Sequence, residues 1–139
     1  MKTYKTTIEK YNLVKESTDI LKAKLTNSDN VYNYFISIWN NDIEISESFY
    51  ALFLNRCNIT KGYKEISRGG ISGTVVDTRL VAKYAIETLS SAVIVAHNHP
   101  SGNPIPSEAD KYLTKKIKST MDIFDVTLLD HIILTKDKY

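Results

Sequence analysis

The chain has 139 residues, enough for one domain that buries an apolar core without disulfides. Apolar residues make up 42% and charged residues 24%, and the formal net charge is only +2, which gives weak support for nucleic-acid binding. The single cysteine, Cys57, excludes an intrachain disulfide and a cysteine-rich metal site, and it fits a reducing, cytoplasmic setting. We expect neither a signal peptide nor a membrane span, because no long apolar run occurs.

Hydrophobic periodicity and turn residues predict the secondary structure. A polar N-terminal extension over residues 1–27 is expected to hold a short strand at 11–14 and a short helix at 18–25. The domain proper spans 28–139. Its first half is expected to hold a helix over 29–40 capped by Ser28, strands over 47–55 and 59–67, and a loop over 68–73. Its second half is expected to hold a helix from Asp77 or Thr78 to Leu89, a strand over 92–96, a loop over 97–106, a helix beginning at Ser107 and a strand over 126–135. The wholly apolar run at 92–96 indicates a central strand covered on both faces. This order predicts a mixed sheet with helices packed on it, an α/β (α+β) fold.

The most informative stretch joins that buried strand to the next helix, and over 97–110 it reads HNHPSGNPIPSEAD. His97 and His99 are two residues apart, so a continued strand would point both imidazoles to the same face. Asp110 lies in the first turn of the following helix, which a loop with three prolines would bring back over the strand end. Zinc accepts nitrogen and carboxylate ligands, and three protein ligands leave a fourth position open for water.

Each of these residues also has a purely structural interpretation. A histidine pair often occurs at a strand end without a metal, and Ser107 with Asp110 forms a variant of the helix capping box. Capping and catalysis can coexist, and the combination of histidine pair, stiffened loop and carboxylate favours a metal site. The three letters His-Asn-His do not match the nucleases nicknamed after them, whose residues are spread over a long ββ-metal unit.

The stretch resembles the JAMM metalloprotease motif of the JAB/MPN domain, in which His-x-His-Pro and six further residues precede Ser-x-x-Asp. The longer pattern HNHPSGxPxPSxxD, followed by LDHII at 129–133, is similar to the bacterial RadC family, with weaker similarity from about Glu47 onward. The resemblance implies an MPN/cytidine-deaminase-like architecture and one zinc ion on His97, His99 and Asp110. It also implies that Glu47 is the general base and that Ser107 stabilises the oxyanion.

Elementary chemistry is consistent with these roles. Zinc lowers the pKa of a bound water to about 7, a carboxylate can carry its proton to a leaving nitrogen, and a hydroxyl donor to the oxyanion is worth roughly 3 kcal/mol. Glu47 is preferred to Glu44 as the base because it directly precedes the apolar strand. For Asp130 and His131 we favour a buried, hydrogen-bonded pair. A contact that orients a metal ligand, or a role of His131 in substrate binding, stays open.

The leading hypothesis is therefore a zinc-dependent hydrolase of a peptide or isopeptide bond, acting on a peptide or protein substrate. A DNA-repair-associated RadC-type protein that binds nucleic acid without peptidase activity is the main alternative, and a non-catalytic MPN scaffold is another. The first 27 residues are too short for the family's helix-hairpin-helix region. Family members usually continue beyond the last predicted strand, so a missing edge element and a trimmed chain are both open alternatives. The sequence lacks the Pro-Cys-x-x-Cys of zinc deaminases. No membrane partner is expected, and a homodimer through a free strand edge is an open alternative.

Overall fold

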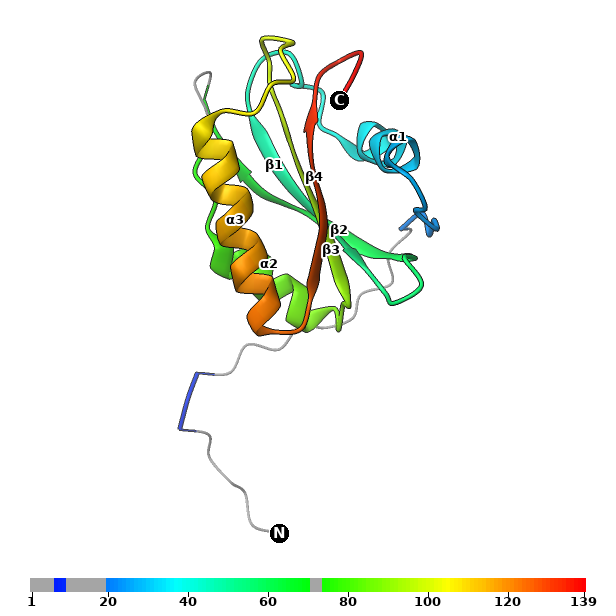
Figure 1. The fold of residues 1–139 in the computed structure, drawn as a ribbon, viewed down its shortest axis with the longest axis vertical. Coiled ribbons are helices and arrows are strands. Elements are labelled where there is room, and N and C mark those ends of the chain that lie inside the picture. Colours follow the sequence, from blue (N-terminus) through cyan, green and yellow to red (C-terminus); the bar gives the residue numbers. More distant parts are fainter. Residues whose placement is uncertain (1–6, 10–19, 71–73) are drawn as a thin grey trace.

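Figure 1 shows the computed structural model of the chain, which describes residues 7–9, 20–70 and 74–139. The elements are α1 (Ser28–Ile38), β1 (Ser48–Leu54), β2 (Thr60–Arg68), α2 (Thr78–Glu87), β3 (Ala92–Asn98), α3 (Glu108–Ile123) and β4 (Thr127–Leu134). Each helix and strand predicted from residue 28 onward is present, with ends that differ by a few residues. Within the described part of the chain, no helix is both long and apolar enough to span a membrane.

The four strands form one mixed sheet in the order β2-β1-β3-β4. Strand β1 is antiparallel to β2 and β3, whereas β3 and β4 are parallel and are joined through α3. Helices α2 and α3 cover one face of the sheet and α1 covers the other (Figure 1). The α/β prediction is confirmed, and so is the central position of the apolar strand at 92–96, because every residue of β1 and β3 is buried.

Alternation along the central strands divides the core into two apolar clusters. In β3, Val95 belongs to the cluster packed on α2 and α3, and Ala96 belongs to the cluster packed on α1. Because successive side chains of a strand point to opposite faces, His97 lies on the α3 side and Asn98 on the α1 side. The end of β3 therefore presents one polar side chain to each layer of the fold.

Two of the three helix starts agree with the sequence prediction. The side chain of Asp77 caps α2, and Ser107 caps α3 as part of a capping box. The cap of α1 was predicted one residue too late, because the side chain of Asn27, not Ser28, accepts the hydrogen bond from the N–H of Asn30. That helix ends at Ile38, two residues before the predicted end.

Two other predictions need correction. Strand β3 continues through Asn98, so His97 belongs to the strand and not to the loop that follows it. The helix expected over 18–25 is wrong in its described part, because residues 20–25 are not helical and Lys24 instead forms an isolated antiparallel bridge with Ile59. Pairing with the start of β2 overrides the local helix propensity here. The strand expected at 11–14 lies outside the described residues.

Candidate metal centre

The two histidines of the motif converge at the C-terminal end of β3. His97 is buried near the C-terminal end of β3. His99 follows the strand, and its backbone N–H donates to the carbonyl of Leu134 in β4 at 2.9 Å. Their Nε2 atoms lie 2.9 Å apart. The sequence spacing thus correctly predicted that both imidazoles reach one point, and the pairing of β3 with β4 holds the second ring there.

Asp110 brings a carboxylate to the same point from the N-terminus of α3. Its Oδ1 lies 3.2 Å from Nε2 of His97, and its Oδ2 lies 3.2 Å from Nε2 of His99. The same carboxylate accepts the N–H of Ser107 at 2.8 Å, while the Ser107 hydroxyl accepts the N–H of Asp110 at 3.1 Å. The capping interpretation and the convergence with the histidines are therefore both correct, because the cap fixes the carboxylate where it meets the two rings.

Glu47 completes a four-residue cluster beside β1. Among the described residues, one ligand atom from each of Glu47, His97, His99 and Asp110 lies within 4.8 Å of the other three. The alternative glutamate, Glu44, is exposed and lies outside the cluster, with its carboxylate 3.6 Å from Nζ of Lys136. The structure therefore places Glu47, and not Glu44, beside the histidines.

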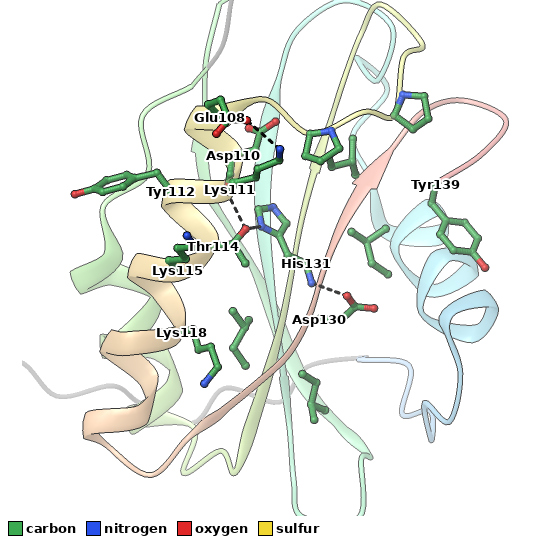
Figure 2. Close-up of a pocket in the computed structure, with 16 residues that line it drawn as sticks. Glu108, Asp110, Lys111, Tyr112, Thr114, Lys115, Lys118, Asp130, His131 and Tyr139 are labelled. Atoms are coloured by element: carbon green, nitrogen blue, oxygen red, sulfur yellow. Dashed lines mark hydrogen bonds and ion pairs between the residues drawn. The ribbon is translucent and has the colours of Figure 1, made fainter.

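The orientation of His97 follows from a chain of hydrogen bonds that ends at a backbone carbonyl. The Thr114 hydroxyl donates to the carbonyl of Asp110 at 2.8 Å, so it can only accept from Nδ1 of His131, which lies 2.6 Å away. Nε2 of a neutral His131 must then accept from Nδ1 of His97 at 2.7 Å. Figure 2 shows His131 pointing from β4 toward Thr114 of α3. This chain leaves Nε2 of the neutral His97 ring without a hydrogen, facing the cluster.

His99 is oriented in the same sense by the loop. Its Nδ1 lies 2.7 Å from the carbonyl oxygen of Asn103, which can only accept, so Nδ1 carries the hydrogen. In the neutral rings, Nε2 of both histidines and the Asp110 carboxylate then converge as three acceptors with no hydrogen between them. Acceptors so close repel one another unless a cation lies among them. Their separations of 2.9 to 3.2 Å are near the roughly 3.3 Å between neighbouring ligands of a tetrahedral zinc site.

The electrostatics of the site favour these protonation states. Burial lowers the pKa of His97 to about 4, although the Asp110 carboxylate opposes this, and burial with the neighbouring His97 lowers the pKa of His131 to about 3. Burial tends to raise the pKa of Asp110, but the hydrogen bonds from Ser107 and the adjacent imidazoles bring it below its usual value. Burial raises the pKa of Glu47, partly offset by His99. At neutral pH the rings of His97 and His131 are therefore neutral and Asp110 is an anion.

Asp130 and His131 do not form the buried pair that we favoured from the sequence. Asp130 is exposed, and its carboxylate accepts only the backbone N–H of His131 at 2.9 Å. The two side chains point to opposite faces because they are neighbours on a strand. The contact of His131 with His97 instead supports the alternative in which His131 orients a histidine of the cluster.

Sequence reasoning missed Asn98 and Thr114. Asn98 is buried, and its side chain bonds to the backbone of Ile43, Ser46 and Ser48, the last of which begins β1 next to Glu47. A polar residue inside a buried strand, next to His97 but on the opposite face, was a signal for such a role. Thr114 lies four residues after Asp110, and this spacing would have placed it on the same side of the helix.

A groove of about 940 Å³ lies between α3 and the edge strand β4, next to the cluster (Figure 2). Asp110, Thr114 and His131 line one part of it. Lys115 and Lys118 of α3 and apolar residues of β4 such as Ile133 line the rest. The groove therefore offers space for a ligand of mixed polarity beside the candidate metal centre.

Comparison with known proteins agrees with this architecture. Residues 25–139 match the family model described as the RadC-like JAB domain. The chain belongs to this family. The residues that match the model of the RadC-like JAB domain include Glu47 and the whole 97–110 stretch.

The curated relatives are longer proteins. A UPF0758 protein of Flavobacterium johnsoniae is 46% identical over 123 residues, which cover 87% of this chain and 52% of the relative. A UPF0758 protein of Listeria welshimeri is 41% identical over 93 residues, 67% of this chain and 42% of the relative. One from Neisseria meningitidis is 36% identical over 112 residues, 80% of this chain and 48% of the relative. The chain thus spans about half the length of the curated relatives it matches.

Proposed function

We propose that this RadC-like JAB domain is a zinc-dependent hydrolase that cleaves a peptide or isopeptide bond. The observation that supports it most directly is the convergence of three acceptor atoms, from His97, His99 and Asp110, beside the carboxylate of Glu47. Two nitrogens and one carboxylate oxygen are a donor set typical of catalytic zinc sites. The set is complete here, which argues against the alternative of a non-catalytic scaffold.

In this proposal each residue of the cluster has one role. His97, His99 and Asp110 hold one zinc ion per chain, and the ion supplies a water activated at neutral pH. Glu47 takes the proton of the attacking water and delivers it to the leaving nitrogen, a task helped by its raised pKa. The Ser107 hydroxyl accepts the N–H of Asp110, so its own hydrogen is free to donate to the oxyanion that develops on the substrate carbonyl.

The partner is proposed to be a peptide or protein in the cytoplasm. The groove beside the cluster has the mixed polar and apolar lining that a peptide needs, and the exposed thiol of Cys57 suits a reducing compartment. Nucleic-acid binding has less support. Two of the three lysines of α3 that line the groove are paired with acidic neighbours, Lys111 with Glu108 and Lys118 with Asp122.

The proposal is tested with zinc-loaded protein on a panel of peptides and protein fusions. We expect one zinc per chain by elemental analysis and hydrolysis that falls about 1,000-fold in Glu47→Gln, which removes the base, while the zinc content stays unchanged. Glu44→Gln is the matched control, because it removes an exposed carboxylate of the same segment and should keep full activity. A folded, zinc-loaded protein that cleaves no member of the panel would refute the hydrolase proposal.

A further inference from the structure

Asn98 closes β3 with a side chain whose hydrogen bonds are all satisfied by one segment. It is fully buried on the α1 side of the sheet. Its amide nitrogen donates to the carbonyls of Ile43 at 2.8 Å and Ser46 at 2.9 Å. Its Oδ1 accepts the N–H of Ser48 at 2.7 Å. Both amide hydrogens and the oxygen are therefore used to hold residues 43–48.

These bonds fall on either side of Glu47. Ser46 and Ser48 are the two chain neighbours of that glutamate, and Asn98 bonds to the backbone of both. A third bond fixes the residue itself, since the N–H of Gly69 donates to the Glu47 carbonyl at 2.8 Å. The backbone of Glu47 is thus held from both sides, and Asn98 provides two of the three contacts.

We propose that Asn98 is a positioning residue that aims the carboxylate of Glu47 at the metal centre. The inference rests on the proposed function of Glu47 as the base. His97 and Asn98 are consecutive, so the strand end that presents a metal ligand on its α3 side also holds, from its α1 side, the backbone on either side of Glu47. Together with the pairing of β1 with β3, these bonds fix the backbone of Glu47 relative to His97. Such precision matters because a displacement of about 1 Å in an active site can cost roughly 100-fold in rate.

The three hydrogen bonds of the Asn98 side chain, called the clamp from here on, require an asparagine. Aspartate has the same shape but no donor, so its carboxylate would face the carbonyls of Ile43 and Ser46 and repel them. Serine can donate one bond but is too short to span all three partners. Glutamine has the same polar groups on a chain that is one methylene longer, which a filled core does not accommodate without strain. Asn98→Asp and Asn98→Ser therefore break the clamp in two different ways.

A matched control is Thr60, which begins β2 and pairs with the end of β1 that lies away from Glu47. Thr60 is also buried, and its hydroxyl accepts the N–H of Ala23 at 2.9 Å and donates to the carbonyl of Leu21 at 3.1 Å. Thr60→Val removes a buried side-chain clamp on a neighbouring segment without touching the segment that carries Glu47. Any effect that comes only from reduced stability should appear in this variant as well.

The first arm of the test is structural and needs no substrate. Crystal structures of the zinc-loaded wild type, Asn98→Asp, Asn98→Ser and Thr60→Val proteins are compared. We expect the Glu47 carboxylate to move by more than about 1 Å in both Asn98 variants, with His97, His99 and Asp110 unmoved, and to stay in place in Thr60→Val. A Glu47 carboxylate that keeps its position in both Asn98 variants overturns the proposal. So does a failure of both Asn98 variants to fold when Thr60→Val folds, because Asn98 would then serve only the fold.

The second arm is kinetic and separates positioning from stability. On a peptide that the wild type cleaves, we expect kcat to fall about 100-fold in Asn98→Asp with KM and zinc content unchanged. In the Glu47→Gln background the same substitution should cause no further loss, because Asn98 acts through Glu47. A further loss in that background overturns the proposal. If the wild type cleaves nothing, the hydrolase proposal fails, and the crystal structures still decide whether Asn98 places Glu47.

Discussion

His97 and Asn98 are neighbours at the end of β3, yet their side chains enter opposite layers and are satisfied in opposite ways. On the α3 side, Nε2 of His97 faces two other acceptors and has no hydrogen to share with them. On the α1 side, every polar atom of Asn98 is paired with the backbone. Buried polar groups are normally paired, so a set of converging acceptors is the arrangement that suits a cation. Converging acceptors thus mark the candidate metal centre on one face of β3, and complete hydrogen bonding marks a fixed backbone on the other.

The sharpest test of this contrast replaces each of the two residues by alanine. Apparent zinc-binding energies of roughly 10–16 kcal/mol divided among about four ligands give roughly 2.5–4 kcal/mol each, so His97→Ala should weaken zinc binding roughly 70- to 900-fold. Asn98→Ala should bind zinc with unchanged affinity. It should instead lower the free energy of unfolding of the metal-free protein by about 3 kcal/mol, because three buried partners lose a bond.

Competition with a chromophoric zinc chelator and urea unfolding measure the two quantities. Equal zinc affinities for His97→Ala and the wild type would remove His97 from the metal centre. A loss of zinc affinity in Asn98→Ala as large as that in His97→Ala would erase the distinction between the two faces.

The next largest effect is the pH dependence of the free energy of unfolding that the buried imidazoles of His97 and His131 cause. In the unfolded chain the imidazoles titrate near 6.5, whereas burial lowers the pKa to about 4 for His97 and about 3 for His131. Between these values the unfolded chain binds more protons, so stability rises with pH and falls on acidification. From pH 7 to 4 each ring should remove roughly 3 kcal/mol from the free energy of unfolding of the metal-free protein.

Urea unfolding in the presence of a chelator, at several pH values from 7 to 4, measures this dependence. His131→Leu is the matched variant, because it removes one of the two rings and should lose about half of the slope. The difference between the two proteins isolates the imidazole contribution from the carboxylates of Glu47 and Asp110. A slope that is the same in both proteins would mean that His131 is not buried as a neutral ring.

The sequence predicted the local parts of this site, and the family resemblance supplied the distant Glu47. The pair His97 and His99, the capping box of Ser107 with Asp110, and the alternation of the buried strands all follow from spacings of two to four residues. Thr114 had a local signal in its spacing from Asp110, whereas the role of Asn98 depends on contacts between distant segments. Asn98 meets residues 43–48 across the sheet, and the register between strands is not readable from either strand alone.

The same limit explains two errors. His131 was expected to pair with its neighbour Asp130, but the register of β4 brings its ring to His97. The cap of α1 was placed at Ser28 because Asn27 and Ser28 are adjacent residues of nearly equal capping preference. The sequence alone does not show which of the two residues caps α1, because the path of the backbone into the helix decides it.

A smaller effect, on zinc affinity, is expected when His131, the acceptor that orients the ring of His97, is replaced. His131→Leu leaves the Nδ1 hydrogen of His97 without a partner, so the ring is no longer held with Nε2 toward the cluster. Loss of such an orienting contact typically costs 10- to 100-fold in metal affinity. Chelator competition measures the change. Asp130→Asn is the control, because Asp130 is exposed and its carboxylate bonds to the backbone N–H of His131 and not to the ring. Wild-type zinc affinity in His131→Leu would show that His131 is not needed to orient His97.

The smallest effect concerns the last link of the chain, the Thr114 hydroxyl. Thr114→Val keeps the shape of the side chain but leaves the Nδ1 hydrogen of His131 without an acceptor and removes the bond to the Asp110 carbonyl. We expect the free energy of unfolding to fall by about 1–2 kcal/mol and the zinc affinity to fall only a few-fold, because His131 still contacts His97.

Thr120→Val tests whether that loss belongs to the histidine chain or to the helix. Thr120 makes the same back-bond on α3, to the carbonyl of Lys116 at 2.8 Å, but on an exposed part of the helix. If the two valine variants lose equal stability and neither changes zinc affinity, the hydroxyl of Thr114 serves only α3. If only Thr114→Val weakens zinc binding and Thr114→Ser restores it, the orientation of His97 depends on a chain of contacts that begins at the backbone of Asp110, so both ligands are held by the same helix.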